Sequence, residues 1–219
     1  MYANNWLGII LSYVLVFVII GVSTVLQKKG ILKDEGARKF IHIGVSNWWI
    51  LAMLFFDNVW FAIVPPITFI ILNYASYKMN LIKSMERSGN GNLGTVYFPI
   101  SLLILVIVSF GLLKQPEIGA IGILILGYGD GFAAVIGQKY GKHKLKFNKS
   151  LEGSLAMFVA SLVVSLIILF IYQGNSAFYL APLIAILATV IELYTPKGLD
   201  NLTVPLSNSL VYYLLLLGI

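Results

Sequence analysis

Cysteine is absent from this sequence, and charged residues make up only 11% of its 219 positions. Without cysteine the chain can form no disulfide framework, thiolate nucleophile or zinc–thiolate site. A soluble globular domain carries about 25% charged residues, so this chain has too few of them to cover a surface that faces water. The composition therefore excludes cysteine chemistry and a soluble globular fold.

Apolar residues are abundant instead. They make up 59% of the chain, and its mean hydropathy is +0.90. A membrane-spanning helix needs about 20 mainly apolar residues, so the length suits about seven or eight spans with short connections. The N-terminal segment lacks the basic stretch of a cleavable signal peptide, so we expect its apolar run to be retained as the first helix. We predict an all-α, polytopic transmembrane helix bundle that forms one domain over residues 1–219. The expected spans cover residues 6–26, 38–56, 59–74, 94–113, 117–139, 151–172, 178–194 and 202–218.

Basic residues gather in every second connection of this predicted bundle. The positive-inside rule places such connections in the cytoplasm, which puts both termini on the outer side. Much of the net charge of +6 has this origin, because orientation alone requires basic inner loops. We therefore expect an integral protein of the cell membrane. Its inner connections carry Lys28, Lys29, Lys33, Arg38, Lys39, Lys78, Lys83, Arg87, Lys139, Lys142, Lys144, Lys146, Lys149 and Lys197.

Four acidic residues lie at or near predicted helix ends on this cytoplasmic side. An ionisable group inside a span is costly, so each is a candidate functional residue. Carboxylates supply the hard oxygen ligands that Mg²⁺ prefers, and Mg²⁺ usually takes one or two of them together with substrate phosphates. Because lysines lie nearby, we expect these acids to form a magnesium and phosphate site. They are Asp130, Glu152, Glu192 and Asp200.

Asp130 stands in a run of small residues, between Gly129 and Gly131. Glycine lets a backbone or a ligand approach closely, and a face of small residues favours close helix packing. One alternative is that this face only packs and that Asp130 pairs with a lysine. Packing alone does not require an acid, so we predict that Asp130 acts in the site.

A basic segment follows, and its cations beside glycine suggest a phosphate cradle. Its glycine spacing is one residue too short for a P-loop, and His143 stands where a serine or threonine would bind Mg²⁺, so we reject a P-loop fold. Ser150 is a candidate N-cap for the next helix, whose positive end would face a phosphate. The alternative is a plain cap with an ion pair between Lys149 and Glu152, which we expect on one helix face from their spacing of three.

Two other segments place polar residues at membrane depth. Arg38, Lys39 and His42 open the second span, and spacings of three and four put them on one side of its helix. The alternative is a basic anchor beside a satisfied core histidine. Near the C-terminus, Pro196 and Gly198 break the backbone between two spans. A broken segment at membrane depth is tolerated only when it is buried in protein or lines a cavity.

Together these segments resemble one family of membrane enzymes, the dolichol kinases, phytol kinases and CTP-dependent diacylglycerol kinases. The matching blocks occur in the family's order and cover nearly the whole chain. They are RKFIHIG at 38–44, NLGTVYFP at 92–99, GDGFAAVIGQKYGKHK at 129–144, NKSLEGS at 148–154 and ELYTPKGLDNLTVPL at 192–206. The central block is also similar to that of phosphatidate cytidylyltransferases. The histidine-glycine-glycine and aspartate-rich signature of those enzymes is missing from this sequence, which favours a kinase.

The resemblance implies transfer of the terminal phosphate of a nucleoside triphosphate, often CTP, with ATP as the other donor, to an isoprenoid alcohol or diacylglycerol. It implies an active site at the cytoplasmic helix ends, in segments 33–46, 86–99, 127–154 and 192–206. Its catalytic residues would be Asp130, Lys149, Glu152 and Asp200, and Asp130, Glu152, Glu192 and Asp200 would hold Mg²⁺. The nucleotide and its phosphates would contact Arg38, Lys39, His42, Asn92, Thr95, Lys142, His143, Lys144 and Asn201.

Within this scheme one carboxylate, for which we choose Asp130, would accept the hydroxyl proton, and His42 is the alternative base. The lipid alcohol would reach the site from the membrane, and we expect no nucleic-acid partner. The sequence does not distinguish among lipid alcohols or oligomeric states. A cation-coupled transporter is a rival from another class, but it would more often show inverted repeats and a midplane site.

Overall fold

The computed structural model describes residues 4–79, 93–196 and 198–218, and these form helices without a β-strand. The all-α fold is therefore confirmed. The α-helices are α1 (Asn5–Lys28), α2 (Asp34–Ser46), α3 (Trp48–Phe55), α4 (Val59–Ala62), α5 (Val64–Met79), α6 (Gly94–Leu105), α7 (Pro116–Leu124), α8 (Gly131–Tyr140), α9 (Leu151–Gln173), α10 (Ala177–Tyr194) and α11 (Asp200–Leu217). Two π-helical segments, η1 (Val106–Leu112) and η2 (Ile125–Asp130), continue α6 and α7, and 3₁₀ turns η3 (Lys146–Asn148) and η4 (Gly174–Ser176) flank α9.

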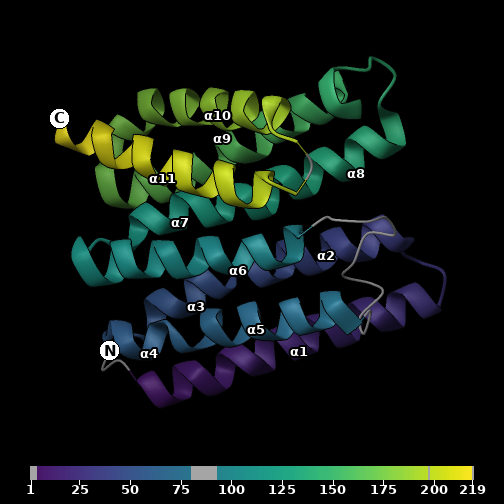
Figure 1. The fold of residues 1–219 in the computed structure, drawn as a ribbon. Coiled ribbons are helices and arrows are strands. Elements are labelled where there is room, and N and C mark those ends of the chain that lie inside the picture. Colours follow the sequence, from purple (N-terminus) through teal and green to yellow (C-terminus); the bar gives the residue numbers. More distant parts are fainter. Residues whose placement is uncertain (1–3, 80–92, 197, 219) are drawn as a thin grey trace.

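Within the described residues, five continuous helical stretches, some of which combine two or more of these elements, are long and apolar enough to cross a membrane. They cover Asn5–Lys28, Val59–Met79, Gly94–Leu112, Pro116–Tyr140 and the 44-residue stretch Leu151–Tyr194. The last of these turns back on itself at η4, so that α9 and α10 lie side by side (Figure 1). The other two predicted spans correspond to the α2–α3 pair and to α11, and the count of about eight spans stays a prediction.

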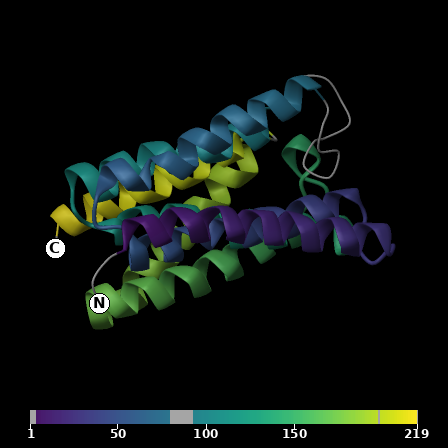
Figure 2. The same ribbon diagram turned by 90° about the horizontal axis from the view of Figure 1, so that it is seen from below.

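The helices run up and down the bundle, so their connections fall at two ends (Figures 1 and 2). The first turn of α1 and the last turn of α11 lie at one end. The start of α2, the end of α8 and the link from α10 to α11 lie at the opposite end (Figure 1). The predicted orientation, with both termini on the outer side of the membrane, stays a prediction.

Two of the predicted spans are each divided into two helices: the span expected over 38–56 forms α2 and α3, and the span expected over 59–74 forms α4 and α5. The span expected over 38–56 begins earlier, at Asp34, and breaks at Asn47. The Asn47 amide donates hydrogen bonds to the carbonyl oxygens of Ile43, at 2.8 Å, and Gly44, at 3.3 Å. The side chain thus satisfies carbonyl groups at membrane depth, where no water is available for them. Pro65 and Pro66 fall in the first turn of α5, where the missing N–H of proline costs no helix bond.

The segment Pro116–Tyr140 is the most buried of the five long helices, and glycines allow neighbouring helices to reach its backbone. A Cβ atom on Gly129 would lie 2.5 Å from Met157 Sδ of α9, and one on Gly131 would lie 2.4 Å from Ile43 Cγ1 of α2. At these glycines, therefore, it is the neighbouring helices α9 and α2 that make the predicted close approach. Because η2 is held between α2 and α9, its last residue, Asp130, has a fixed position.

Gly127→Ala should destabilise the bundle by about 1–3 kcal/mol, the usual cost of overpacking a well-packed core. The new Cβ would lie 1.9 Å from Ser46 Oγ and 2.3 Å from Ser46 Cβ, and these atoms are too close to the α2 backbone to swing away. The measurement is thermal unfolding of the purified protein in detergent. Gly21→Ala is the control, because a Cβ atom there would meet no described atom within 4 Å outside its own stretch of helix. Equal melting temperatures for the two variants would contradict the packing described for η2.

Candidate active site

Three buried carboxylates meet at the end of the bundle opposite the first turn of α1. Asp130 is the last residue of η2, Glu192 lies in the last turn of α10, and Asp200 is the first residue of α11. One carboxylate oxygen from each lies within 4.8 Å of the other two. Their exposed fractions are 5%, 5% and 6%. Asp130 is therefore brought together with two acids more than 60 residues later in the sequence, and the three form a single cluster, hereafter the acid cluster.

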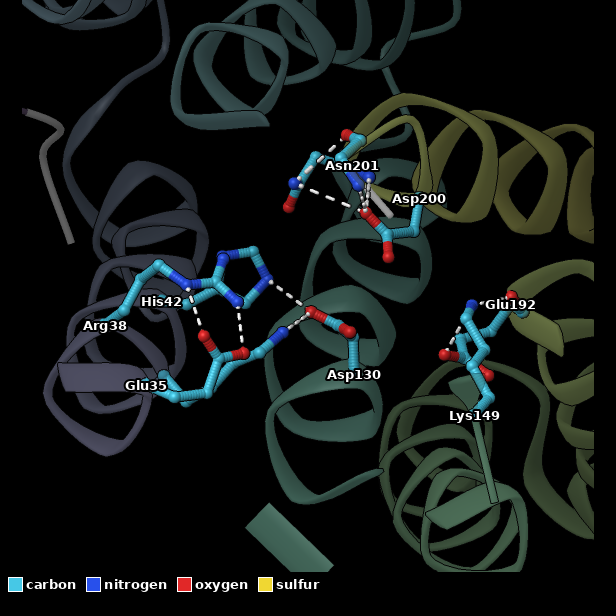
Figure 3. Close-up of polar contacts among 10 residues, drawn as sticks. Glu35, Arg38, His42, Asp130, Lys149, Glu192, Asp200 and Asn201 are labelled. Carbon is cyan, nitrogen blue, oxygen red and sulfur yellow. Dashed lines mark hydrogen bonds and ion pairs between the residues drawn. The ribbon is translucent and has the colours of Figure 1, made fainter. Parts of the chain in front are cut away.

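Two lysines accompany the acid cluster: Lys39 is buried, and Lys149 (Figure 3) is half-buried. Lys39 of α2 donates a hydrogen bond to Asp130 Oδ2. Lys149, which precedes α9, places its Nζ 2.7 Å from Glu192 Oε1 and also donates to the Glu192 carbonyl oxygen. Three carboxylates thus face two ammonium groups, which leaves an excess of negative charge when all are ionised. A buried excess charge is costly unless another cation or hydrogen-bond donors compensate it.

Asp200 differs from the other two acids because it makes no ion pair with any residue that the structure describes. Its Oδ1 instead accepts hydrogen bonds from the backbone N–H groups of Gly198, at 2.9 Å, and Asn201, at 3.1 Å. Gly198 has a φ of 102°, a conformation that favours glycine. The predicted break between α10 and α11 therefore serves to orient the Asp200 carboxylate.

The acid cluster fits a hard divalent cation. Its donors are carboxylate oxygens, which Mg²⁺ prefers, and one of the three lacks a cationic partner among the described residues. Sequence spacing also proposed Glu152 as a metal ligand, but the structure does not bring it into this group. Glu152 Oε1 lies 2.8 Å from His143 Nδ1 instead, so its predicted part in metal binding has no geometric support here and stays a prediction.

A polar cavity of about 410 Å³ lies against the acid cluster. Lys39, Lys144 and Lys149 line it, together with Ser150 and the first turn of α9. Ser150 is the N-cap that the sequence predicted, because its hydroxyl accepts a hydrogen bond from the Gly153 N–H at 3.1 Å. A helix N-terminus attracts anions through its free N–H groups and its dipole. The cavity thus combines cations, a helix start and carboxylates that can hold a metal.

Some lining residues of this polar cavity were missed by sequence reasoning. Gln138 and Asn148 line it, as does Ser154, whose buried hydroxyl makes no hydrogen bond with a described residue. Glu35 also lines it and pairs with Arg38 at 2.5 Å. Ser154 lies four residues after Ser150 in the 148–154 block, so its position within that block was the available signal.

A second, smaller cavity of about 120 Å³ lies on the other side of α2. Apolar side chains from α1, α2, α5 and α6 form most of its wall. His42 lines it, and the Nε2 atom of His42 is 3.6 Å from Asp130 Oδ2 (Figure 3). That buried nitrogen makes no hydrogen bond with a described residue. His42 and Asp130 therefore form the boundary between an apolar and a polar cavity.

The residues predicted to bind nucleotide divide into four groups. Lys39 and Lys144 line the polar cavity, whereas Arg38, His42, Thr95 and Asn201 line the apolar one. Lys142 and His143 are exposed and line neither. Asn92 lies outside the described residues. The structure therefore brings together only part of the predicted set around the acid cluster.

The amino-acid sequence is similar to those of several phytol kinases. It is 30% identical to the phytol kinase of Synechocystis sp., over 94% of this chain and 90% of that protein. It is 32% identical to probable phytol kinase 1, chloroplastic, of Oryza sativa subsp. japonica, over 87% of this chain and 67% of that one. It is 27% identical to phytol kinase 1, chloroplastic, of Arabidopsis thaliana, over 86% of this chain and 69% of that protein. No family model and no solved structure matches the chain.

Proposed function

The chain belongs to the phytol kinase family, and we propose that it is a membrane enzyme that transfers the terminal phosphate of a nucleoside triphosphate to an isoprenoid alcohol. The observation that carries this proposal is that the acid cluster lines a polar cavity, while His42, 3.6 Å from Asp130, lines an apolar cavity. The polar cavity offers three lysines for phosphates and three clustered carboxylates for a divalent cation, as a metal-bound triphosphate requires, and the other cavity is mostly apolar, as a lipid alcohol requires. The names of the relatives support phytol or a similar alcohol as the acceptor.

Positioning and charge neutralisation supply most of the catalysis in phosphoryl transfer. In our proposal Lys39, Lys144, Lys149 and the start of α9 hold the phosphates in the polar cavity. Asp130, Glu192 and Asp200 would hold Mg²⁺, which neutralises charge that develops on the phosphate oxygens. CTP is the proposed donor, from the resemblance of the sequence blocks, and ATP is the alternative. We place this site at the cytoplasmic face, because basic residues gather in the connections between helices at this end of the bundle.

The reaction would proceed by direct displacement. The hydroxyl oxygen of the alcohol attacks the terminal phosphorus, the bond from that phosphorus to the bridging oxygen breaks, and the nucleoside diphosphate leaves. The hydroxyl proton passes to a nearby base, for which we propose the carboxylate of Asp130. The products are an isoprenoid monophosphate and a nucleoside diphosphate.

Purified protein in detergent should transfer label from γ-labelled CTP to an isoprenoid alcohol in the presence of Mg²⁺. The assay offers CTP and ATP in turn, with phytol, a longer polyprenol and diacylglycerol as acceptors. Label in a lipid phosphate identifies both substrates. Label transferred from α-labelled CTP to phosphatidate, with release of pyrophosphate, would instead indicate a cytidylyltransferase. Failure of both reactions with folded protein would overturn the proposal and favour transport.

A further inference from the structure

We infer that the apolar cavity between α1, α2, α5 and α6 binds the first isoprene units of the acceptor alcohol, with the hydroxyl group held at His42. This inference rests on the proposed function and adds to it the route by which the lipid enters and the surface that selects its chain.

The wall of the apolar cavity matches a hydrocarbon chain. Val16 and Ile20 of α1, Leu72 of α5 and Phe98 and Leu102 of α6 all line it. Polar side chains also line it, but Arg38 is paired with Glu35, and the Asn73 and Asn201 amides donate to backbone carbonyl groups. A triphosphate would therefore find few partners there, and unpartnered buried polar groups are costly. A branched hydrocarbon has no such groups, so it is the occupant that this surface fits.

His42 gives the cavity a polar end directly beside the acid cluster. Its Nε2 atom is buried, makes no hydrogen bond with a described residue, and lies 3.6 Å from Asp130 Oδ2. A hydroxyl group placed next to both would lie within hydrogen-bonding reach of the imidazole Nε2 and of the Asp130 carboxylate. The otherwise unexplained histidine nitrogen thus points to an alcohol at this position.

The size of the cavity implies that the rest of the chain lies outside it. Pockets that enclose a drug-sized ligand measure about 300–1,000 Å³, whereas this cavity measures about 120 Å³. Phe17 of α1 and Leu72 of α5 line it and are also exposed on the outer surface of the bundle. Figure 2 shows α1 and α5 diverging toward this end of the bundle. The chain would therefore leave between these two helices and continue in the lipid.

A larger apolar cavity, of about 650 Å³, lies between α3, α8 and α9 but does not fit this role. Its described lining residues include no counterpart of His42, which lies 3.6 Å from Asp130, and the hydroxyl of Tyr128 in its wall already donates to Asn47. An alcohol bound there would have no group beside it that links its hydroxyl to the proposed phosphate-donor site. The two cavities thus give two distinguishable outcomes for a labelling experiment.

The first test uses an isoprenoid alcohol that carries a diazirine on its second isoprene unit. Irradiation with the purified protein, without nucleotide, followed by mass spectrometry should place the label on peptides from α1, α5 or α6, and unlabelled alcohol should compete. Label confined to α9, or label spread evenly over the lipid-facing surface, would overturn the inference. Because no phosphate transfer is needed, this result is independent of the proposed function.

The second test compares two neighbouring residues of α5. Leu72 lines the cavity and is 46% exposed, whereas Ile71 is 63% exposed and does not line it. Leu72→Trp should lower kcat/KM for a long isoprenoid alcohol by about 10-fold or more, a typical effect of changed pocket shape, and should reduce the diazirine label. Ile71→Trp should leave both near the wild-type level.

The outcomes separate the two proposals. If wild-type protein transfers phosphate but Leu72→Trp behaves like Ile71→Trp, the cavity is not the acceptor site and the kinase assignment stands. If wild-type protein transfers no phosphate yet the label falls on α1, α5 or α6 and is lost in Leu72→Trp, the lipid site stands and the kinase assignment fails.

Discussion

Asp200→Asn should lower phosphate transfer by about 10³-fold, similar to the loss of a strong electrostatic contact in an active site, while the melting temperature stays near that of wild type. The substitution keeps an oxygen that can accept from the Gly198 and Asn201 N–H groups. It also leaves no described lysine without its partner, because Asp200 makes no ion pair in the described part of the chain. The change thus removes a metal-binding charge with little cost to the fold.

The measurement for Asp200→Asn is transfer of γ-label to an isoprenoid alcohol, together with thermal unfolding in detergent. Asp57→Asn is the matched control, because Asp57 lies at the other end of the bundle, where it accepts a hydrogen bond from Asn5. Activity near the wild-type level in Asp200→Asn would remove Asp200 from the proposed site. A large loss of stability would show that its role is structural.

Asp130→Asn should abolish transfer as well, but it should also destabilise the protein by about 3–5 kcal/mol, because it leaves the buried Lys39 without its partner. The two effects can be separated by Lys39→Met. We expect the double variant Lys39→Met/Asp130→Asn to regain much of the lost stability, since both charges are then removed, but to regain no activity. The measurements are again label transfer and thermal unfolding.

The single variants complete this comparison. Lys39→Met alone should destabilise the protein, because it leaves the Asp130 carboxylate buried without its ammonium partner. A non-additive recovery in the double variant would confirm the pairing. If the double variant recovered activity together with stability, Asp130 would be a structural residue and the proposed base would have to be another group.

The sequence predicted the helices and the main acids because both leave local signals. Long apolar stretches require helices in a membrane, and Asp130 stands out as an acid among small apolar residues. The contacts of Asp130 were not predictable in the same way. Its partner Lys39 is 91 residues away, and no local pattern specifies such a pairing.

Two spacing arguments gave a wrong or incomplete grouping, for physical reasons that the structure makes clear. Lys149 and Glu152 were expected on one helix face, but Lys149 precedes the N-cap Ser150 in extended backbone, with φ −76° and ψ 170°. Helical spacing does not apply to it, and Lys149 pairs with Glu192 instead. Arg38, Lys39 and His42 do follow helical spacing, yet α2 stands between two cavities, so Lys39 lines one and the other two line the second.

The central claim, that the acid cluster holds the divalent cation used with a nucleotide, is tested most directly by Mn²⁺ binding. Electron paramagnetic resonance would count bound Mn²⁺ in wild-type protein and in Asp200→Asn, each with and without a nucleoside triphosphate. We predict tight Mn²⁺ binding to wild-type protein in the presence of nucleotide, and a large loss of it in Asp200→Asn. Equal Mn²⁺ binding by the two proteins, or none by wild type with nucleotide present, would contradict the account.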